Sequence, residues 1–291
     1  MTANPSTFQA SQQRLCPRCR SVFASATCPR DGSPTAVDRT ESVVGGCRLT
    51  VLLDVDSTRA LWRGLDTQTG SGVVVQLFEV APLFGAREIE RCLARHKAFR
   101  HPNVAPIVAH GRTGDAHFLV YAYEHELRTV ASVIAQGPLA WRDALDVARY
   151  VLTALASAQE ANLHHDALTA ATVGVTYQVD GSLYPVLLEL GLHAGSSDPR
   201  LDLEAVARLF LDMTGAASMD ALGTDVPVTL RDALRRAFRD RSGAWESAQA
   251  MAYALAAVPI PPRTRSASRI GGSTAPWAVN RAQAVAPEER P

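Results

Sequence analysis

The sequence of 291 residues has no excess of charge of either sign, because 29 Lys and Arg residues balance 29 Asp and Glu residues. Proteins that bind nucleic acids or membrane surfaces in general need a surplus of basic side chains to hold phosphates. The balance therefore argues against both classes of partner, although it is compatible with a local basic patch.

Long apolar stretches are also missing. A membrane-spanning helix needs roughly 20 consecutive apolar residues, and a run such as PVLLELGL at 185–192 is far shorter. The first residues, MTANPSTFQASQQRL, do not combine a positive start with an apolar stretch, as a secretory signal would. We therefore expect a cytoplasmic protein that does not contact a membrane.

Cysteine is scarce, and its odd count of 5 in a chain without a signal does not indicate a disulfide scaffold. Three of the cysteines cluster in CPRCRSVFASATCPRDG, as Cys16-x2-Cys19 followed by Cys28-x2-Asp31. Two Cys-x2-Cys knuckles at such spacing would form a tetrahedral zinc site, and a carboxylate can also bind zinc. The pattern predicts zinc bound by these three cysteines and Asp31.

Two alternatives to this zinc site stay open. Cys47 or a partner chain could supply the fourth ligand, or the segment could be a degenerate one without metal. A segment this short lacks a core of its own and could hardly fold without a metal ion. Its expected role is contact with another protein rather than catalysis.

The chain divides by composition into five parts. Residues 1–14 are polar and aperiodic, and the tail 259–291 is rich in Pro, Ser, Gly, Ala and Arg, so we expect both to be disordered. Between them lie the cysteine segment 15–36, a linker 37–46 and one large domain at 47–258.

Within 47–258, strand and helix patterns alternate in a mixed α+β order. We expect three strands first, then a helix, a further strand, a long helix, a hairpin and three helices. Their ranges are 47–55, 59–67 and 72–80; 86–99; 117–124; 138–161; 173–190; and 201–215, 226–239 and 244–257.

Over residues 47–257 the sequence resembles the eukaryotic-like serine/threonine protein kinases of bacteria. The resemblance depends on landmarks that occur in the family's order: RHPNV at 100–104, HFLVYAY at 117–123, LHHD at 163–166, LLELGL at 187–192 and DLEAVARLFLDMTG at 202–215. It implies a bilobal protein-kinase-like fold with a strand-rich N-lobe and a helical C-lobe. The cysteine segment likewise resembles the zinc-ribbon-like segment that some of these kinases carry before the catalytic domain.

The resemblance also identifies the positions that would bind ATP. A kinase cradles the triphosphate in a glycine-rich turn, because a Cβ atom would block the close approach of the backbone. The glycine positions here correspond to Asp54, Asp56 and Arg59. Carboxylates would repel the phosphates, and we expect instead a solvated turn between strands. Tyr121 falls near the position that guards the adenine pocket and would narrow it.

The family's phosphate-binding lysine corresponds to Gln76, and the helix glutamate that pairs with it corresponds to Cys92. A glutamine can donate a hydrogen bond, but it carries no charge and cannot replace an ion pair. Both partners of the activating ion pair are therefore expected to be missing.

In the catalytic loop, the resemblance places Asp166 at the base position, Leu168 at the lysine position and Ala171 at the metal-binding asparagine position. Leucine cannot stabilise transferred charge and alanine cannot bind magnesium. The second metal ligand is replaced by Glu189, which can still bind a metal. Asp202, at the position that braces the loop in the family, is kept.

Residues that build the fold are thus retained, while most residues that perform the chemistry are replaced. The segment from Glu189 to Asp202 is also too short for a peptide-docking platform. We therefore expect a pseudokinase that serves as a scaffold or regulator and binds a protein partner, such as an active kinase or another signalling protein, without binding ATP or magnesium. The alternatives are a divergent active kinase with Asp166 as base, and a sensor that binds ATP without hydrolysing it.

Overall fold

The computed structural model describes residues 13–56, 59–78, 86–114, 116–123, 127–179, 181–192, 198–239 and 243–260. A compact unit extends to Val258, and a second unit begins at Pro259. Of the two segments expected to be disordered, 1–14 and 259–291, residues 1–12 and 261–291 lie outside the described residues. In the described part of the chain, no helix combines the length and the apolar character that crossing a membrane requires.

The cysteine segment contains a small antiparallel sheet in the order β2-β1-β3. Its strands are β1 (Arg14–Leu15), β2 (Val22–Phe23) and β3 (Ala36–Val37). Two tight turns lie between the strands, because the Arg20 N–H donates to the Cys16 carbonyl at 3.1 Å and the Gly32 N–H donates to the Cys28 carbonyl at 2.9 Å. Each turn presents cysteine side chains to the other.

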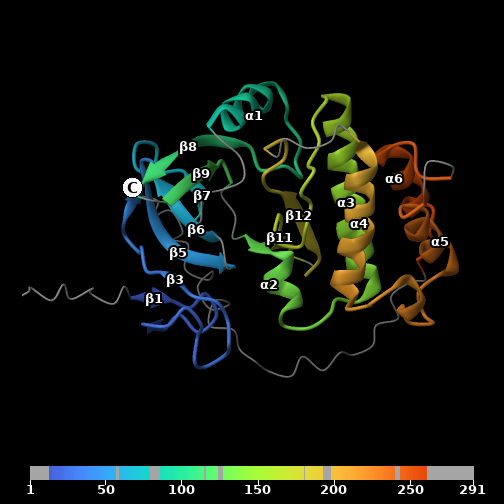
Figure 1. Ribbon diagram of the computed structural model, residues 1–291, viewed down its shortest axis with the longest axis horizontal. Helices are drawn as coiled ribbons and strands as arrows, with labels where there is room; N and C mark the ends of the chain where they lie inside the picture. Colours follow the sequence, from blue (N-terminus) through green and yellow to red (C-terminus); the bar gives the residue numbers. More distant parts are fainter. Residues whose placement is uncertain are drawn as a thin grey trace, which may run out of the picture. The chain divides into compact units, whose positions relative to one another are not determined.

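A six-stranded antiparallel sheet follows, with the strand order β4-β5-β6-β7-β9-β8 (Figure 1). Turn residues between apolar runs separate the strands, and the central strand β7 is buried along most of its length. Helix α1 (Ala86–Ala98) connects β7 to the last two strands. The strands are β4 (Val43–Val44), β5 (Cys47–Val55), β6 (Arg59–Asp66), β7 (Gly72–Phe78), β8 (Ile107–Thr113) and β9 (Ala116–Tyr121).

The rest of the unit is mainly helical, with α3 and α4 lying side by side (Figure 1). A small sheet of β10 (Arg128–Thr129), β11 (Val173–Tyr177) and β12 (Leu183–Leu187) packs against α3. The helices are α2 (Val130–Ile134), α3 (Trp141–Glu160), α4 (Pro199–Thr214), a short 3-10 helix (Met219–Ala221), α5 (Val228–Arg236) and α6 (Ala248–Ala256).

A hydrophobic cluster joins the six-stranded sheet to the segment after β12. Leu119 and Tyr121 from the sheet pack with Leu188 and Leu192 from this segment, and Ile89 of α1 completes the cluster. Burial of several large apolar side chains contributes on the order of 2 kcal/mol each. This packing fixes residues 188–192 against the sheet and so positions Glu189, which lies between them.

Most of the expected elements are present, and β5 is found over its whole expected range. The linker expected at 37–46 is more structured than its sequence suggests, because Val43–Val44 pairs with β5 as strand β4. Strand β8 and helix α2 were not expected. Helix α2 has only five residues, and β8 is a sheet edge with few buried side chains, so its hydrophobic alternation is weak.

Candidate functional site

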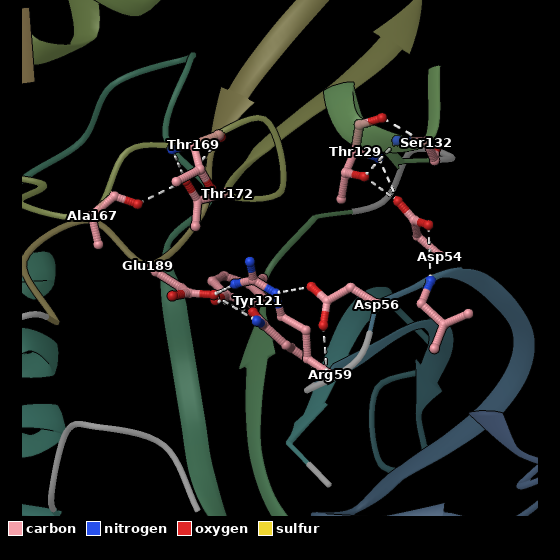
Figure 2. A network of polar contacts seen from close by, with 12 residues as sticks. Asp54, Asp56, Arg59, Tyr121, Thr129, Ser132, Ala167, Thr169, Thr172 and Glu189 are labelled. Carbon is pink, nitrogen blue, oxygen red and sulfur yellow. Dashed lines mark hydrogen bonds and ion pairs between the residues drawn. The ribbon is translucent and has the colours of Figure 1, made fainter. Parts of the chain in front are cut away.

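Glu189 lies at the centre of a polar network between the six-stranded sheet and the segment after β12 (Figure 2). Its side chain is only 3% exposed, and its backbone has φ +60°, a conformation that is uncommon for residues other than glycine. The carboxylate accepts a hydrogen bond of 2.6 Å from Gln76 Nε2 and forms an ion pair with the Arg59 guanidinium. Glu189, which the resemblance places at a metal-ligand position, is therefore paired with two residues of the sheet.

Gln76 connects this carboxylate to Tyr121. The Tyr121 hydroxyl donates to Gln76 Oε1 at 2.7 Å, so both ends of the Gln76 amide are bonded. The pairing of β7 with β9 brings these side chains together, since Gln76 lies opposite Leu119, two residues before Tyr121. Burial, followed by the charge of Glu189, raises the pKa of Tyr121 well above its usual value, so its hydroxyl stays a hydrogen-bond donor.

Arg59 is held from two sides. Its Nε donates to Asp56 Oδ2 at 2.7 Å, and its backbone N–H donates to Asp56 Oδ1 at 2.9 Å, while the guanidinium also reaches Glu189. Burial by itself would lower the pKa of Arg59, but the charges of Glu189 and Asp56 raise it. Arg59, in the expected glycine-rich turn, is thus held by Asp56 of the same turn and forms an ion pair with Glu189.

Asp54 forms a second contact, between β5 and the start of helix α2 (Figure 2). Its Oδ2 accepts a hydrogen bond from the Thr129 N–H at 3.2 Å and another from the Thr129 hydroxyl, and its Oδ1 accepts from the Val55 N–H at 2.8 Å. Thr129 also caps α2 through Ser132 N–H. Asp54 is 9% exposed. The expectation of a solvated turn is therefore wrong at Asp54, because helix α2 covers it.

The loop at 163–172 is held by the side chain of Asp202. Asp202 accepts the backbone N–H groups of His165 and Asp166, each at 2.9 Å, which confirms its expected bracing role. Asp166 is half-buried with φ +58°. Leu168 is buried in the core of the helical part, and Ala171 is half-buried beside Thr172. Leu168 therefore contributes to packing, apart from the Glu189 network.

Cys92, at the expected glutamate position on α1, is buried against the segment that carries Glu189. Its thiol donates to the Leu190 carbonyl at 3.1 Å, and burial raises its pKa to about 12. The thiol is therefore neutral at pH 7 and contributes packing and one weak hydrogen bond.

The four predicted metal ligands also come together. One side-chain atom of each of Cys16, Cys19, Cys28 and Asp31 lies within 4.8 Å of the others. Cys19 Sγ is 3.7 Å from Cys28 Sγ, and Cys16 Sγ is 3.5 Å from Asp31 Oδ2. Cys47 is not a member of this group within the described residues. The group could hold a metal ion with the set of ligands expected from the sequence.

Thr129 was missed by the reasoning from the sequence, although it has a local signal. A threonine directly before the apolar run VASVI is typical of a helix N-cap. No local pattern, however, indicates that its partner is Asp54, which is 75 residues earlier in the chain.

No family model and no curated protein matches the sequence. Among solved structures, the chain is similar to the PAN3 pseudokinase of Neurospora crassa, with a TM-score of 0.57 and 13% identity, and to a mutant of that protein, with a TM-score of 0.59 and 14% identity. Each match covers 79% of this chain and 64% of the other, so the chain spans less than two thirds of those proteins. At such low identity the likeness shows the fold alone. The fold is protein-kinase-like.

The contact of Asp54 with Thr129 leads to a prediction about pH. Burial raises the pKa of Asp54 in the folded state, and the hydrogen bonds from Thr129 and Val55 offset only part of this shift. For a raised pKa, the stabilising contribution is complete below the unfolded pKa of about 4 and is lost as the pH rises through the folded pKa. We expect wild type to lose stability relative to Asp54→Asn between pH 4 and neutrality, as measured by urea unfolding. If the free energies of unfolding of the two proteins differed by the same amount at pH 4 and at pH 7, this prediction would be contradicted.

Proposed function

We propose that the protein is a catalytically inactive, kinase-like scaffold or regulator of bacterial signalling that acts by binding a protein partner. The supporting observation is the network of Gln76, Glu189, Arg59 and Tyr121. These residues stand at positions that the kinase resemblance assigns to the lysine, the metal ligand and the glycine-rich turn, and in this chain they pair with one another. The partner would be an active serine/threonine kinase or another signalling protein in the cytoplasm.

We expect weak or no binding of a nucleotide with magnesium, because it would compete with Gln76 and Arg59 for Glu189. Magnesium at Glu189 would compete with Gln76 and the Arg59 guanidinium, which both contact Oε1 of a carboxylate that is 3% exposed. Removing one partner of such a buried pair costs about 3–5 kcal/mol. In addition, neither Leu168 nor Ala171 offers a charge or a metal ligand in return.

We also propose that the N-terminal segment is a zinc-ribbon-like module with three thiolate ligands and one carboxylate ligand. Tetrahedral zinc with bonds of about 2.3 Å to sulfur places two sulfurs about 3.8 Å apart. The distance between Cys19 and Cys28 sulfurs is 3.7 Å, which supports the assignment. Zinc would supply structural cross-linking in this segment, and no chemical step is assigned to it.

The proposal is tested by titrating the full chain with ATP in a calorimeter, with and without magnesium. We expect no binding up to millimolar ATP, whereas an active kinase of the same family, titrated in parallel, binds. Micromolar binding would contradict the proposal. A phosphotransfer assay of wild type and Asp166→Asn would then distinguish a divergent kinase, which loses activity on substitution, from a nucleotide sensor, which has none to lose.

A further inference from the structure

A row of arginines runs along the outer side of helix α1. Arg87, Arg91 and Arg95 are exposed and follow one another at steps of four residues, which places them on one ridge of the helix. Ile89 and Cys92, on the other side, are buried in the core. The helix therefore presents a basic ridge outward in a chain whose overall charge is balanced.

This ridge ends at a pocket. The Phe99 N–H donates to the Arg95 carbonyl at 3.1 Å, so the helical path continues for one more step and brings Phe99 into line with the arginines. Phe99 lines a pocket of about 310 Å³ together with Arg100, His101, Pro102, Val104 and Pro106. Phe99 thus places the pocket one helical step beyond the last arginine of the ridge.

The walls of the pocket are mainly apolar. His101 Nδ1 accepts the Asn103 N–H at 3.1 Å, and burial lowers the pKa of His101, so this ring is neutral at pH 7. Pockets for small ligands begin at about 300 Å³ and bury most of a molecule. A pocket at this lower limit fits one or two apolar side chains of a larger partner.

We propose that the ridge and the pocket together dock an acidic segment of a protein partner. Its carboxylates would pair with Arg87, Arg91 and Arg95, and one apolar side chain would enter the pocket beside Phe99. The ridge spans about 12 Å, since a helix rises about 1.5 Å per residue, and two turns of an acidic helix match that length. This inference deepens the proposed function, on which it rests, by naming a surface for the partner.

A protein segment fits this surface better than a polyanion does. Nucleic acids and anionic membranes gain affinity from many phosphate contacts with a broad basic surface, whereas the charges of this chain balance overall and the ridge offers three arginines. The pocket requires an apolar anchor next to the charges. An acidic peptide carries both features on consecutive turns.

The probe for the test is a phage-displayed library of random peptides, selected on the immobilised full chain. We expect enrichment of peptides that combine several Asp or Glu residues with one Leu, Ile or aromatic residue. Reversal of the three charges removes the ion pairs and replaces them with repulsion, so Arg87→Glu, Arg91→Glu and Arg95→Glu together should weaken binding of the selected peptides about tenfold. Rising salt concentration should weaken peptide binding as well.

The control for net charge is Arg48→Glu, Arg235→Glu and Arg239→Glu, at exposed positions elsewhere. It also breaks the ion pairs of Arg48 with Glu41 and of Arg235 with Asp220, so its folding is checked by thermal melting. It should leave peptide affinity nearly unchanged. Phe99→Ala, checked for folding by thermal melting, should reduce affinity by removing a wall of the pocket.

Peptides without an acidic bias, or unchanged affinity after reversal of the α1 charges, would overturn the inference. So would binding of polyuridine RNA or phosphatidylserine vesicles through these arginines in place of acidic peptides. Because α1 reversal does not alter the Glu189 network, the ATP titration tests the proposed inactivity separately.

Discussion

Replacing Glu189 with alanine is expected to lower the free energy of unfolding by about 3 kcal/mol. The substitution leaves the Arg59 guanidinium, which is 19% exposed, without its more buried partner, and it leaves Gln76 Nε2 without an acceptor. A buried polar group without a partner costs about 1–3 kcal/mol, and more when it is charged. Urea unfolding of the full chain, followed by circular dichroism, measures the difference.

The matched control for this prediction is Asp56→Ala. Asp56 also pairs with Arg59, but its side chain is 37% exposed, so water replaces the lost contact. We expect a loss of about 1 kcal/mol or less. Equal losses for Glu189→Ala and Asp56→Ala would show that burial of Glu189 does not govern the strength of the network.

The double substitution Arg59→Leu and Glu189→Leu tests whether the two charges stabilise the fold as a pair. Removing both charges avoids an unpaired buried ion, and replacing a buried pair with apolar side chains is often close to neutral. The double variant is therefore expected to be more stable than Glu189→Ala. Arg59→Leu and Glu189→Leu are measured singly for comparison, and a double variant that loses as much as these two together would contradict coupling between the residues.

Secondary structure could be predicted where the signal is local. Strands β5 to β7 follow apolar runs separated by turns, and Gly181 adopts φ +81° in the expected hairpin turn. Helix α4 starts two residues earlier than expected, because Asp198 caps it and Pro199 occupies its first turn. The capping residue and the proline are visible in the sequence, but the periodic apolar pattern that marks the helix begins only at Leu201.

The sequence indicates which residue types stand at the candidate positions, but it does not indicate their contacts. Gln76 and Cys92 were expected to leave the activating ion pair without a replacement, yet Arg59 and Glu189 form another pair across 130 residues. Which side chains meet depends on the pairing of β7 with β9 and on the packing of residues 188–192, and both are long-range properties. The metal cluster differs, because each of its knuckles is defined by a spacing of three residues.

Removal of the metal is expected to unfold the N-terminal segment while the six-stranded sheet stays folded. Only Leu15 and Ala36 of this segment join the sheet's hydrophobic cluster, and their burial contributes about 2–3 kcal/mol. Binding of structural zinc contributes on the order of 10 kcal/mol in comparable modules. Hydrogen exchange after chelation should therefore show loss of protection in β1 to β3 and retained protection in β5 to β7.

The ligands themselves are tested by metal analysis of single variants. Wild type is expected to carry zinc, Cys28→Ser to lose it, and Cys47→Ser, a buried cysteine outside the cluster, to keep it. Asp31→Ala tests the carboxylate and should weaken binding, because three thiolates then hold the ion with an open fourth position. Loss of zinc in Cys47→Ser together with full retention in Asp31→Ala would identify Cys47 as the fourth ligand.

The segment also contacts the six-stranded sheet through Arg20, next to Cys19, which donates a hydrogen bond to the Leu52 carbonyl of β5. We expect this hydrogen bond to be lost when the segment unfolds after removal of zinc.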